Sequence, residues 1–463
     1  MMTHDLIVIG AGPAGMAAAT TAAGLGLKTL LLDEQKRPGG QIYRNVTAVN
    51  PKVAAWLGPD YAHGRKLAQA LAASGAEQHH GTLVWDVTPE LCVSTLQEGR
   101  VAQFKAPQLI AATGALERAS PLPGWTLPGV MNAGAAQIAL KAHAAVPSGA
   151  VVLAGAGPLL LLVACQLLDA GAQVVAVVET AAPGNRWLAL NHLPQALGTP
   201  GPLFKGLRWL ARLRRARVPW FKQATQLQAL GEDRLQSLSF VAAGCSHDIK
   251  ADTLLLHHGV VPDTQLSRLL RVQHHWSDQQ LAWLPQVDDG GQTSLAGFRV
   301  AGDGAGIVGA LAAEVSGTLA ALGAAQALGR IAPAAQAALA ARTAALHAAL
   351  ARQRRLRPFL DALYRPPRWL NTPADETLVC RCEEVSAGRV REMARLGCQG
   401  PNQTKFFSRC GMGPCQGRMC GLTVTQLLAD ELGKSPAEVG AYRIRAPLKP
   451  VPLSAIAALA ETE

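Results

Sequence analysis

The chain has 463 residues, of which 49% are hydrophobic and 16% are charged, and its formal net charge is +11. This length predicts several domains rather than one core, and the composition excludes a disordered or fibrous protein. The charge is diffuse apart from the amphipathic stretch 205–222. We interpret that stretch as a solvated helix face; a docking or membrane-surface face is the alternative, and no nucleic-acid partner is expected.

A strand, a glycine-rich turn, a helix and a second strand are predicted at the N-terminus. The turn is G-A-G-P-A-G from Gly10 to Gly15, and the second strand runs to Asp33 and Glu34. Glycines at this spacing let a pyrophosphate approach the backbone at a helix N-terminus. We favour Glu34 over Asp33 for binding the ribose hydroxyls, because we expect Glu34 to end the strand. The glycines within the apolar run 6–32 argue against a membrane helix.

Three further segments favour FAD over NAD as the ligand of this first turn. They are R-P-G-G-Q-I-Y-R at 37–44, A-A-T-G-A at 111–115 and A-G-D-G at 301–304. The last segment offers Asp303 to a ribityl hydroxyl and a helix N-terminus to the phosphates. The candidate FAD-binding residues are Gly10, Gly12, Pro13, Ala14, Gly15, Asp33, Glu34, Gln35, Gly40, Gln41, Thr113, Gly114, Gly302 and Asp303.

A second, incomplete copy of the turn begins at Val152. Gly155 and Gly157 are present, but Leu160 stands where the third glycine is expected, and the next predicted strand ends at Glu179. The bulky side chain should move the helix or remodel the turn. A bound adenine nucleotide, NAD or ATP, and an empty fold are both left open; Glu179 favours NAD over NADP.

The remaining residues of these nucleotide-binding regions provide no catalytic constellation that we identify. They contain no C-x-x-C pair, which argues against a disulfide-reductase mechanism. We expect Cys92, Cys165 and Cys245 to be core residues. The pairs His79–His80 and His257–His258 are not expected to bind metal, because adjacent side chains usually point apart.

The last part of the chain holds six of the nine cysteines, after an alanine-rich helical region at 311–350. Cys380 and Cys382 form a C-x-C pair, and Cys415 lies in a glycine-rich loop with Cys420 or Cys410 as the fourth thiol. Four thiolates suit an iron–sulfur cluster or Zn²⁺. The spacing and the glycines favour [2Fe–2S] over zinc, and Cys398 is expected to be structural.

The predicted fold class is α/β. Two nested Rossmann-like dinucleotide-binding domains, as in two-domain flavoproteins of the disulfide-reductase type, precede a small α-rich [2Fe–2S] domain. The expected boundaries are 1–120 with 285–350 for the discontinuous FAD domain, 121–284 for the inserted nucleotide domain, 351–374 for a linker, 375–448 for the [2Fe–2S] domain and 449–463 for a tail.

The cysteine region resembles the bacterioferritin-associated-ferredoxin type of [2Fe–2S] domain fused to flavoprotein dehydrogenases. The resemblance is carried by C-x-C-E and by G-M-G-x-C-Q-G-x-x-C. It implies that the ligands are Cys380, Cys382, Cys415 and Cys420. Cys410 then falls where that family has a small apolar residue, which makes it an extra thiol.

Nearly the whole chain resembles the α (A) subunit of heteromeric amine dehydrogenases such as opine oxidase, D-hydroxyproline dehydrogenase and hydrogen cyanide synthase. The matching stretches are G-A-G-P-A-G-M-A-A-A, D-E-Q-x-x-x-P-G-G-Q-I-Y-R, residues 112–137 and the cysteine region. The resemblance implies an electron-transferring FAD/[2Fe–2S] subunit. A D-amino-acid-oxidase-like β subunit would oxidise the C–N bond of an opine, D-hydroxyproline, glycine or a similar compound. Further options are an FMN at a subunit interface and a small ferredoxin-like γ subunit.

Two other functions are left open. One is a self-sufficient NAD(P)H-dependent FAD/[2Fe–2S] reductase, and the other is a non-enzymatic iron–sulfur binding protein. We expect a cytoplasmic hetero-oligomer, with membrane association, if any, peripheral at the inner membrane.

Overall fold

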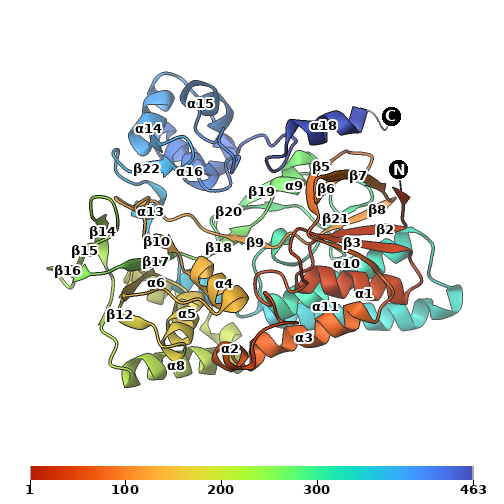
Figure 1. Cartoon of the computed structure of the whole chain (residues 1–463), viewed down its shortest axis with the longest axis horizontal. Helices are drawn as coiled ribbons and strands as arrows, with labels where there is room; N and C mark the ends of the chain where they lie inside the picture. The colour runs from red at the N-terminus through yellow and green to blue at the C-terminus, as the bar shows by residue number, and fades with distance from the viewer. Residues whose placement is uncertain (1, 461–463) are drawn as a thin grey trace. The chain divides into compact units, whose positions relative to one another are not determined.

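A computed structural model describes residues 2–460 of the chain (Figure 1). The described residues divide into two compact units. Unit 1 contains residues up to 116, residues 261–354 and residues from 443 onward; unit 2 contains residues 117–260 and 355–442. The chain passes between the units four times: at the short strands β9 (Ala115–Glu117) and β18 (Val260–Pro262), after residue 354 and after residue 442.

A five-stranded parallel sheet forms the centre of unit 1, with the strand order β21-β8-β2-β3-β4. The central strand, Leu-Ile-Val-Ile, is buried along its whole length, as expected for the middle strand of a parallel sheet that is covered on both faces. The strands are β2 (Leu6–Ile9), β3 (Thr29–Asp33), β4 (Glu77–His80), β8 (Gln108–Ala111) and β21 (Phe298–Val300).

Helices α1 and α10 pack closely against each other beside this sheet (Figure 1). A Cβ atom on Gly317 of α10 would lie 2.0 Å from the Ala14 carbonyl oxygen of α1, so only glycine permits this approach. The helices of unit 1 are α1 (Pro13–Gly24), α2 (Pro51–Leu57), α3 (Pro59–Ala72), α9 (Gln265–Leu269), α10 (Ala310–Ala327), α11 (Gln336–Arg354), α18 (Leu453–Ala460) and the 3₁₀ turns η1 (Gly302–Ala305) and η2 (Pro333–Ala335).

Two smaller sheets complete unit 1. A four-stranded sheet has the order β1-β7-β6-β5, and a two-stranded hairpin pairs β19 with β20. Their bounds are β1 (Met2–Thr3), β5 (Leu83–Val87), β6 (Cys92–Gln97), β7 (Arg100–Lys105), β19 (His274–Ser277) and β20 (Ala282–Pro285).

Unit 2 repeats the plan with a five-stranded parallel sheet in the order β10-β17-β11-β12-β13 and a three-stranded antiparallel sheet, β14-β15-β16. The strands are β10 (Val130–Asn132), β11 (Ala150–Gly155), β12 (Gln173–Glu179), β13 (Trp220–Phe221), β14 (Thr225–Leu230), β15 (Ser237–Ala242), β16 (Cys245–Lys250) and β17 (Thr253–His257). The helices of this part are α4 (Ala133–His143), α5 (Pro158–Asp169), α6 (Gly184–Leu190), α7 (Leu193–Leu197) and α8 (Pro200–Arg215).

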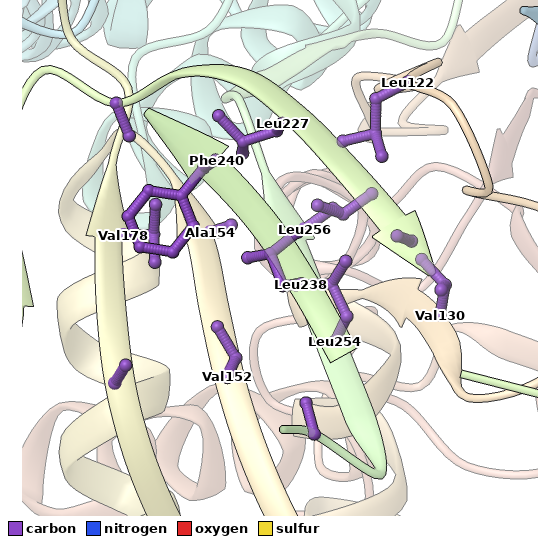
Figure 2. Packing of buried hydrophobic residues seen from close by; sticks show 14 of the residues in the cluster. Leu122, Val130, Val152, Ala154, Val178, Leu227, Leu238, Phe240, Leu254 and Leu256 are labelled. Atoms are coloured by element: carbon purple, nitrogen blue, oxygen red, sulfur yellow. The ribbon is translucent and has the colours of Figure 1, made fainter. Parts of the chain in front are cut away.

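A hydrophobic cluster joins these two sheets of unit 2 (Figure 2). Val152, Leu254 and Leu256 from the parallel sheet pack with Leu238 and Phe240 from the antiparallel sheet. Each side chain of this size contributes about 1.5–3 kcal/mol when fully buried. The cluster therefore holds the strand ends of the parallel sheet, where its loops begin, in fixed positions.

The cysteine region of unit 2 is a small helical module. It contains the hairpin β22 (Leu378–Cys380) and β23 (Val385–Ser386) and the helices α14 (Ala387–Arg395), α15 (Pro401–Ser408), α16 (Gly421–Leu432) and α17 (Pro436–Val439). Trp125 Nε1 donates a hydrogen bond of 2.7 Å to the Leu378 carbonyl oxygen, and Arg381 lies over the Trp125 ring. These contacts attach β22 to the remainder of unit 2.

The structure confirms the predicted α/β class and the helical region after residue 311. Three local expectations were wrong. Strand β3 ends at Asp33, one residue before Glu34; the helix expected over 205–222 ends at Arg215; and Cys245 is exposed on β16, although Cys165 is buried. The expected linker contains two helices, α12 (Arg357–Leu363) and α13 (Arg368–Asn371). The five-part domain division stays a prediction.

Membrane-spanning helices are not found among residues 2–460: none of the helices there is both long enough and apolar enough to cross a bilayer.

Candidate functional site

The first glycine turn lies at the carboxyl end of β2 and continues into α1. A Cβ on Gly10 would lie 2.4 Å from the Ala112 carbonyl oxygen, and one on Gly15 would lie 1.7 Å from the Gly10 carbonyl oxygen. Glycine is therefore required at both positions. Gly12 is the N-cap of α1 and has no side chain to bond the free N–H groups of the first turn, which leaves them directed at an anion.

Three other predicted segments meet this turn. A Cβ on Gly40 would lie 2.8 Å from the Cα of Gly12, and a Cβ on Gly302 would lie 2.8 Å from the Cβ of Ala14. Gly40 and Gly302 both have positive φ angles, +59° and +73°, so both places suit glycine. The loops after the parallel strands β2, β3, β8 and β21 thus meet at the carboxyl ends of these strands and form a cradle lined by backbone.

The polar residues of the cradle also converge there. Thr113 Oγ1 donates to the Asp263 carbonyl oxygen at 3.3 Å, and Gly114 has a φ of +71°. Asp303 Oδ1 accepts from the backbone N–H groups of Val308 and Gly309 at 2.9 and 3.0 Å. Oδ2 of Asp303 has no partner among the described residues, which leaves it available to a hydroxyl.

The two candidate ribose-binding acids have different environments. The Asp33 carboxylate accepts from the N–H groups of Ala11 (2.5 Å) and Gln35 (2.6 Å), and burial raises its pKa more than these bonds lower it. Glu34 is half-exposed and pairs with Lys449. Burial raises the pKa of Glu34, but the hydrogen bond and charge of Lys449 outweigh burial and lower it. Asp33 therefore braces the turn, while Glu34 faces outward.

Among the other predicted residues, Pro13 begins α1 at the turn itself. Gln41 is exposed, and its Oε1 accepts from Arg44 at 3.1 Å. The backbone-lined cradle, the uncapped helix N-terminus and the Asp303 carboxylate fit a flavin adenine dinucleotide, because such a ligand needs close approach of phosphates and acceptors for hydroxyls.

Five thiols gather in the cysteine module. The sulfur atoms of Cys380, Cys410 and Cys420 all lie within 4.8 Å of one another and are buried. Cys382 lies within hydrogen-bonding reach of Cys415 and close enough to Cys380 for their charges to interact. The four predicted ligands thus fall into two groups: Cys380 and Cys420 lie with Cys410, which was expected to be an extra thiol, and Cys382 lies beside Cys415.

Among these five cysteines, the surroundings stabilise the thiolate form of Cys380. Hydrogen bonds from the thiols of Cys410 and Cys420, together with those from the N–H groups of Gly411 and Glu383, outweigh burial and lower the pKa of Cys380. The neighbouring sulfurs and burial raise the pKa of Cys420. Several sulfurs that can each become an anion at such short range are a donor set that fits a metal centre bound by thiolates.

Tyr442 closes the cysteine loop from one side. Cβ atoms on Gly411 and Gly417 would lie 2.7 and 2.6 Å from its ring, and its hydroxyl donates to the Cys410 carbonyl oxygen at 2.8 Å. Those glycines therefore serve to admit the Tyr442 ring, which fixes the path of the backbone that carries Cys410, Cys415 and Cys420.

The second glycine turn opens on a cavity of about 440 Å³ in unit 2. Gly155 and Gly157 keep positive φ angles of +138° and +135°, and Leu160 is buried and lines the cavity. We expected Leu160 to move the helix or to remodel the turn. Its side chain packs in the core between α5 and the sheet. The cavity lining comprises Gly155, Ala156, Gly157, Leu160, Leu161, Glu179, Arg186, Leu210, Arg214, Val218, Trp220, Lys222, Leu363 and Tyr364.

A buried acid–imidazole pair supports this turn, and sequence reasoning missed its acid. Glu117 Oε1 lies 2.6 Å from His257 Nδ1, and Glu117 Oε2 accepts from the Gly134 N–H at 2.9 Å. A Cβ on Gly157 would lie 3.1 Å from His257 Nε2. Only the match of residues 112–137 to a known family could have drawn attention to Glu117.

The neighbouring His258 has other partners. Ser120 Oγ lies 2.8 Å from its Nδ1, and Thr180 Oγ1 lies 3.1 Å from its Nε2. Burial, then the charges of His257 and Arg118, lower the pKa of His258 to about 3, so it is neutral. The two adjacent histidines thus serve separate contacts.

Comparison with known proteins extends over almost the whole chain. Residues 4–338 match the family "Pyridine nucleotide-disulphide oxidoreductase" and residues 374–460 match the "Sarcosine oxidase A3 domain". The chain is 45% identical to the A component of opine oxidase from Agrobacterium tumefaciens (strain Ach5), over 99% of this chain and 92% of that protein. It is 34% identical to the HcnB component of hydrogen cyanide synthase from Pseudomonas aeruginosa, over 97% of each.

Solved structures show the same fold. L-proline dehydrogenase from P. horikoshii has a TM-score of 0.71 with 17% identity, covering 98% of this chain and 79% of that one. Thioredoxin reductase from T. acidophilum has a TM-score of 0.52 with 18% identity and covers 71% of this chain and 100% of that one. The resemblance inferred from the sequence is confirmed by the full-length relatives.

Proposed function

The chain belongs to the pyridine nucleotide-disulphide oxidoreductase family and, within it, to the group of opine oxidase A components, and we propose that it is the electron-transferring subunit of a heteromeric amine dehydrogenase. It is an oxidoreductase that acts on C–N donors. The observation that carries the proposal is the presence, in one chain, of a flavin cradle and a group of five thiols.

FAD bound in the first cradle would supply two-electron chemistry that the side chains cannot provide. The N–H groups at the start of α1 would hold its phosphates, and Asp303 Oδ2 would accept from a ribityl hydroxyl. Glu34 would accept a hydrogen bond from the ribose, and this bond would weaken its ion pair with Lys449. These residues bind and orient the cofactor, and the role of each stays a proposal.

We propose a [2Fe–2S] cluster in the cysteine module, with Cys380, Cys382, Cys415 and Cys420 as ligands. Two close pairs support this set: Cys380 with Cys420, and Cys382 with Cys415. The sulfur atom of Cys410 lies within the same 4.8 Å of those of Cys380 and Cys420, so Cys410 is an alternative ligand. Its backbone is held by Tyr442, and the resemblance gives it no ligand role.

Iron, acid-labile sulfide and the visible spectrum of single-cysteine variants test this set. Cys382→Ser and Cys420→Ser should lose the cluster, whereas Cys410→Ser should keep it. Loss of the cluster in Cys410→Ser with retention in Cys420→Ser would show that Cys410 is the ligand.

The substrate would be oxidised in a partner. Opine oxidase and sarcosine oxidase, to which relatives of this chain belong, act on compounds with a C–N bond. Each of those relatives is named as one subunit of its enzyme, which indicates assembly with other chains. We propose that the partner of this chain is a D-amino-acid-oxidase-like β subunit. Further options are an interface FMN and a small ferredoxin-like γ subunit.

Purification of the tagged chain from its own cells tests the partnership. A co-purifying flavoprotein should be found by mass spectrometry. The complex should oxidise an opine or a related amino acid with a dye acceptor, and the separated chain should not. Comparable turnover by the separated chain would refute the proposal.

The cavity at the second glycine turn favours one further ligand, an adenine nucleotide. Arg186, Arg214 and Lys222 line it beside the N-terminus of α5, which suits phosphates, and Glu179 lies at the end of β12, which suits a ribose. Calorimetric titration with NAD and with ATP distinguishes the two candidates. Gly157→Val, which would place methyl groups against His257, should abolish binding without loss of FAD.

The same cavity is the specific observation in favour of a self-sufficient NAD(P)H-dependent reductase. Anaerobic mixing with NADH separates the two functions. The proposed electron-transferring subunit should show little bleaching of its flavin, whereas the reductase would be bleached rapidly. A chain without flavin bands in its absorption spectrum would instead indicate the non-enzymatic binding protein.

A further inference from the structure

A cationic segment of unit 2 has no role in the flavin cradle or the cysteine module. Residues 186–222, which include most of α6, all of α7 and α8 and strand β13, contain eight Lys or Arg residues and no Asp or Glu. The segment accounts for +8, against a formal net charge of +11 for the entire chain. Arg186, Arg214 and Lys222 line the second-turn cavity and Arg212 pairs with Asp169, while Lys205, Arg208, Arg215 and Arg217 are exposed elsewhere on the segment. This excess of positive charge favours an anionic partner.

The same segment exposes large apolar side chains. Trp187 is 74% exposed, Phe204 is 64% exposed and Leu207 is 60% exposed. Leu188, Leu190 and Leu197 of α6 and α7 are also exposed. We call these six exposed side chains, together with the exposed Lys205, Arg208 and Arg215, the α6–α8 face; Figure 1 shows where the helices α6 and α8 lie in the fold.

Helix α8 does not need this face for its own packing. Leu213 is buried, and Trp209 and Leu210 pack against the core formed with α5. Arg212 pairs with Asp169 at 2.8 Å. The inner side of α8 is therefore already covered, and Phe204, Leu207 and Arg208 lie on the opposite side, one turn apart.

We propose that the α6–α8 face docks on the surface of an anionic membrane. Tryptophan, phenylalanine and leucine side chains can enter the boundary between headgroups and acyl chains, while arginine and lysine contact the phosphates. Arg208 and Arg215 have no ion-pair partner among residues 2–460, so both can reach lipid phosphates.

Charge complementarity favours lipid over a protein partner as the occupant. A protein partner would need an apolar groove for the exposed aromatic and leucine side chains and acidic residues around it for the cations, because the face contains no acid of its own. An anionic bilayer offers an apolar interior and phosphate groups over its whole surface. Because no described helix can cross a bilayer, the docking would be peripheral and reversible. This inference does not depend on the proposed electron-transfer function.

Co-sedimentation of the full-length, cofactor-loaded chain with vesicles tests the inference. The chain should bind vesicles of phosphatidylcholine mixed with phosphatidylglycerol and not vesicles of phosphatidylcholine alone. Binding should fall as salt is raised, because salt screens the exposed cations. Equal binding to both vesicles, or no binding to either, would overturn the proposal.

Two double variants identify the surface. Arg208→Gln with Arg215→Gln should weaken binding to the anionic vesicles by about tenfold or more, since each cation near such a surface is worth about fivefold. Phe204→Ser with Leu207→Ser should weaken it by a similar factor. All four side chains are exposed, so an unchanged melting temperature is expected to show that the variants fold.

Matched controls remove the same charge or the same kind of side chain elsewhere. Arg352→Gln with Arg354→Gln on α11, and Leu453→Ser on α18, should leave binding unchanged. An equal loss in the arginine control would show that net charge alone drives binding and would overturn the assignment to this face. If the α6–α8 variants instead release a co-purifying protein while anionic vesicles do not bind, the face is a protein interface and the proposal is wrong.

Discussion

The two glycine turns of this chain begin alike and end differently. Each follows a buried parallel strand, opens a helix with proline at its start and leads to a strand that ends in an acid. In the first turn Gly15 lies against the Gly10 carbonyl oxygen, and a side chain cannot fit. In the second turn Leu160 stands at that place and packs into the core.

The difference shows that the third glycine of the motif sets how closely helix and strand approach, whereas the first two set the turn. Gly155 and Gly157 keep their positive φ angles although Leu160 is present. The first turn is thereby shaped by close backbone contacts and by the Asp33 carboxylate, and the second by the side chains of Leu160 and the His257–Glu117 pair. Four predictions test this contrast, in order of decreasing effect.

Replacing Gly15 by leucine would give the first turn the residue of the second. A Cβ there would lie 1.7 Å from the Gly10 carbonyl oxygen, so α1 must move and the cradle must open. We expect loss of FAD and a destabilisation of about 3 kcal/mol or more, measured as flavin content and by urea unfolding. In the matched variant Leu160→Gly, FAD should be retained; loss of FAD there would contradict the contrast.

Truncating Leu160 to alanine should leave a cavity beneath the second turn. Leucine-to-alanine changes at buried sites cost about 2–5 kcal/mol, and Leu160 is only 2% exposed. We expect a loss of that size in urea unfolding with an unchanged flavin spectrum. The control is Leu207→Ala on the exposed side of α8, which should cost little; a cost as small for Leu160→Ala would contradict the packing role.

Breaking the pair behind the second turn should affect that turn alone. Glu117→Gln and His257→Asn each leave a buried polar group with a weaker partner, at a cost of about 1–3 kcal/mol. We expect weaker nucleotide binding at the second cavity and a normal FAD content. A double-mutant cycle should show coupling between the two residues; additive effects would mean that the 2.6 Å contact is not what supports the turn.

The smallest expected effect concerns Glu34, the exposed acid that follows β3. The folded-state pKa of Glu34 is lowered from its ordinary value of 4.5, so its ion pair with Lys449 contributes above that pH and is lost as pH falls through the folded-state pKa. Lys449→Met should therefore destabilise the chain near neutral pH, by at most about 1 kcal/mol because both groups are partly exposed. Thermal melts of both chains should converge in acid; a constant difference at all pH values would exclude the ion pair as its cause.

The sequence was sufficient for the elements that local pattern controls. The alternation of buried strands, glycine turns and helices in both nucleotide folds was predicted and confirmed. The end of β3 was placed one residue late, because Asp33 and Glu34 are equally plausible from composition. Their difference depends on which carboxylate meets the Ala11 N–H, a tertiary contact.

The sites were predictable to the extent that their residues lie in one motif. The thiols of the cysteine module were found, but the place of Cys410 beside Cys380 and Cys420 depends on how Tyr442 directs the loop. Glu117 and His257 are 140 residues apart in the chain and meet only in the folded state. Exposure of the α6–α8 face likewise required the structure, because its inner and outer leucines are alike in sequence.

Cofactor analysis of the purified chain tests the central claim most directly. Flavin, iron and acid-labile sulfide should be present at about one FAD and about two irons with two sulfides per chain, and electron paramagnetic resonance of the reduced protein should show an iron–sulfur signal that Cys382→Ser abolishes. Zinc in place of iron, or a chain that holds iron and sulfide but no flavin, would contradict the account of a flavin-to-cluster electron carrier.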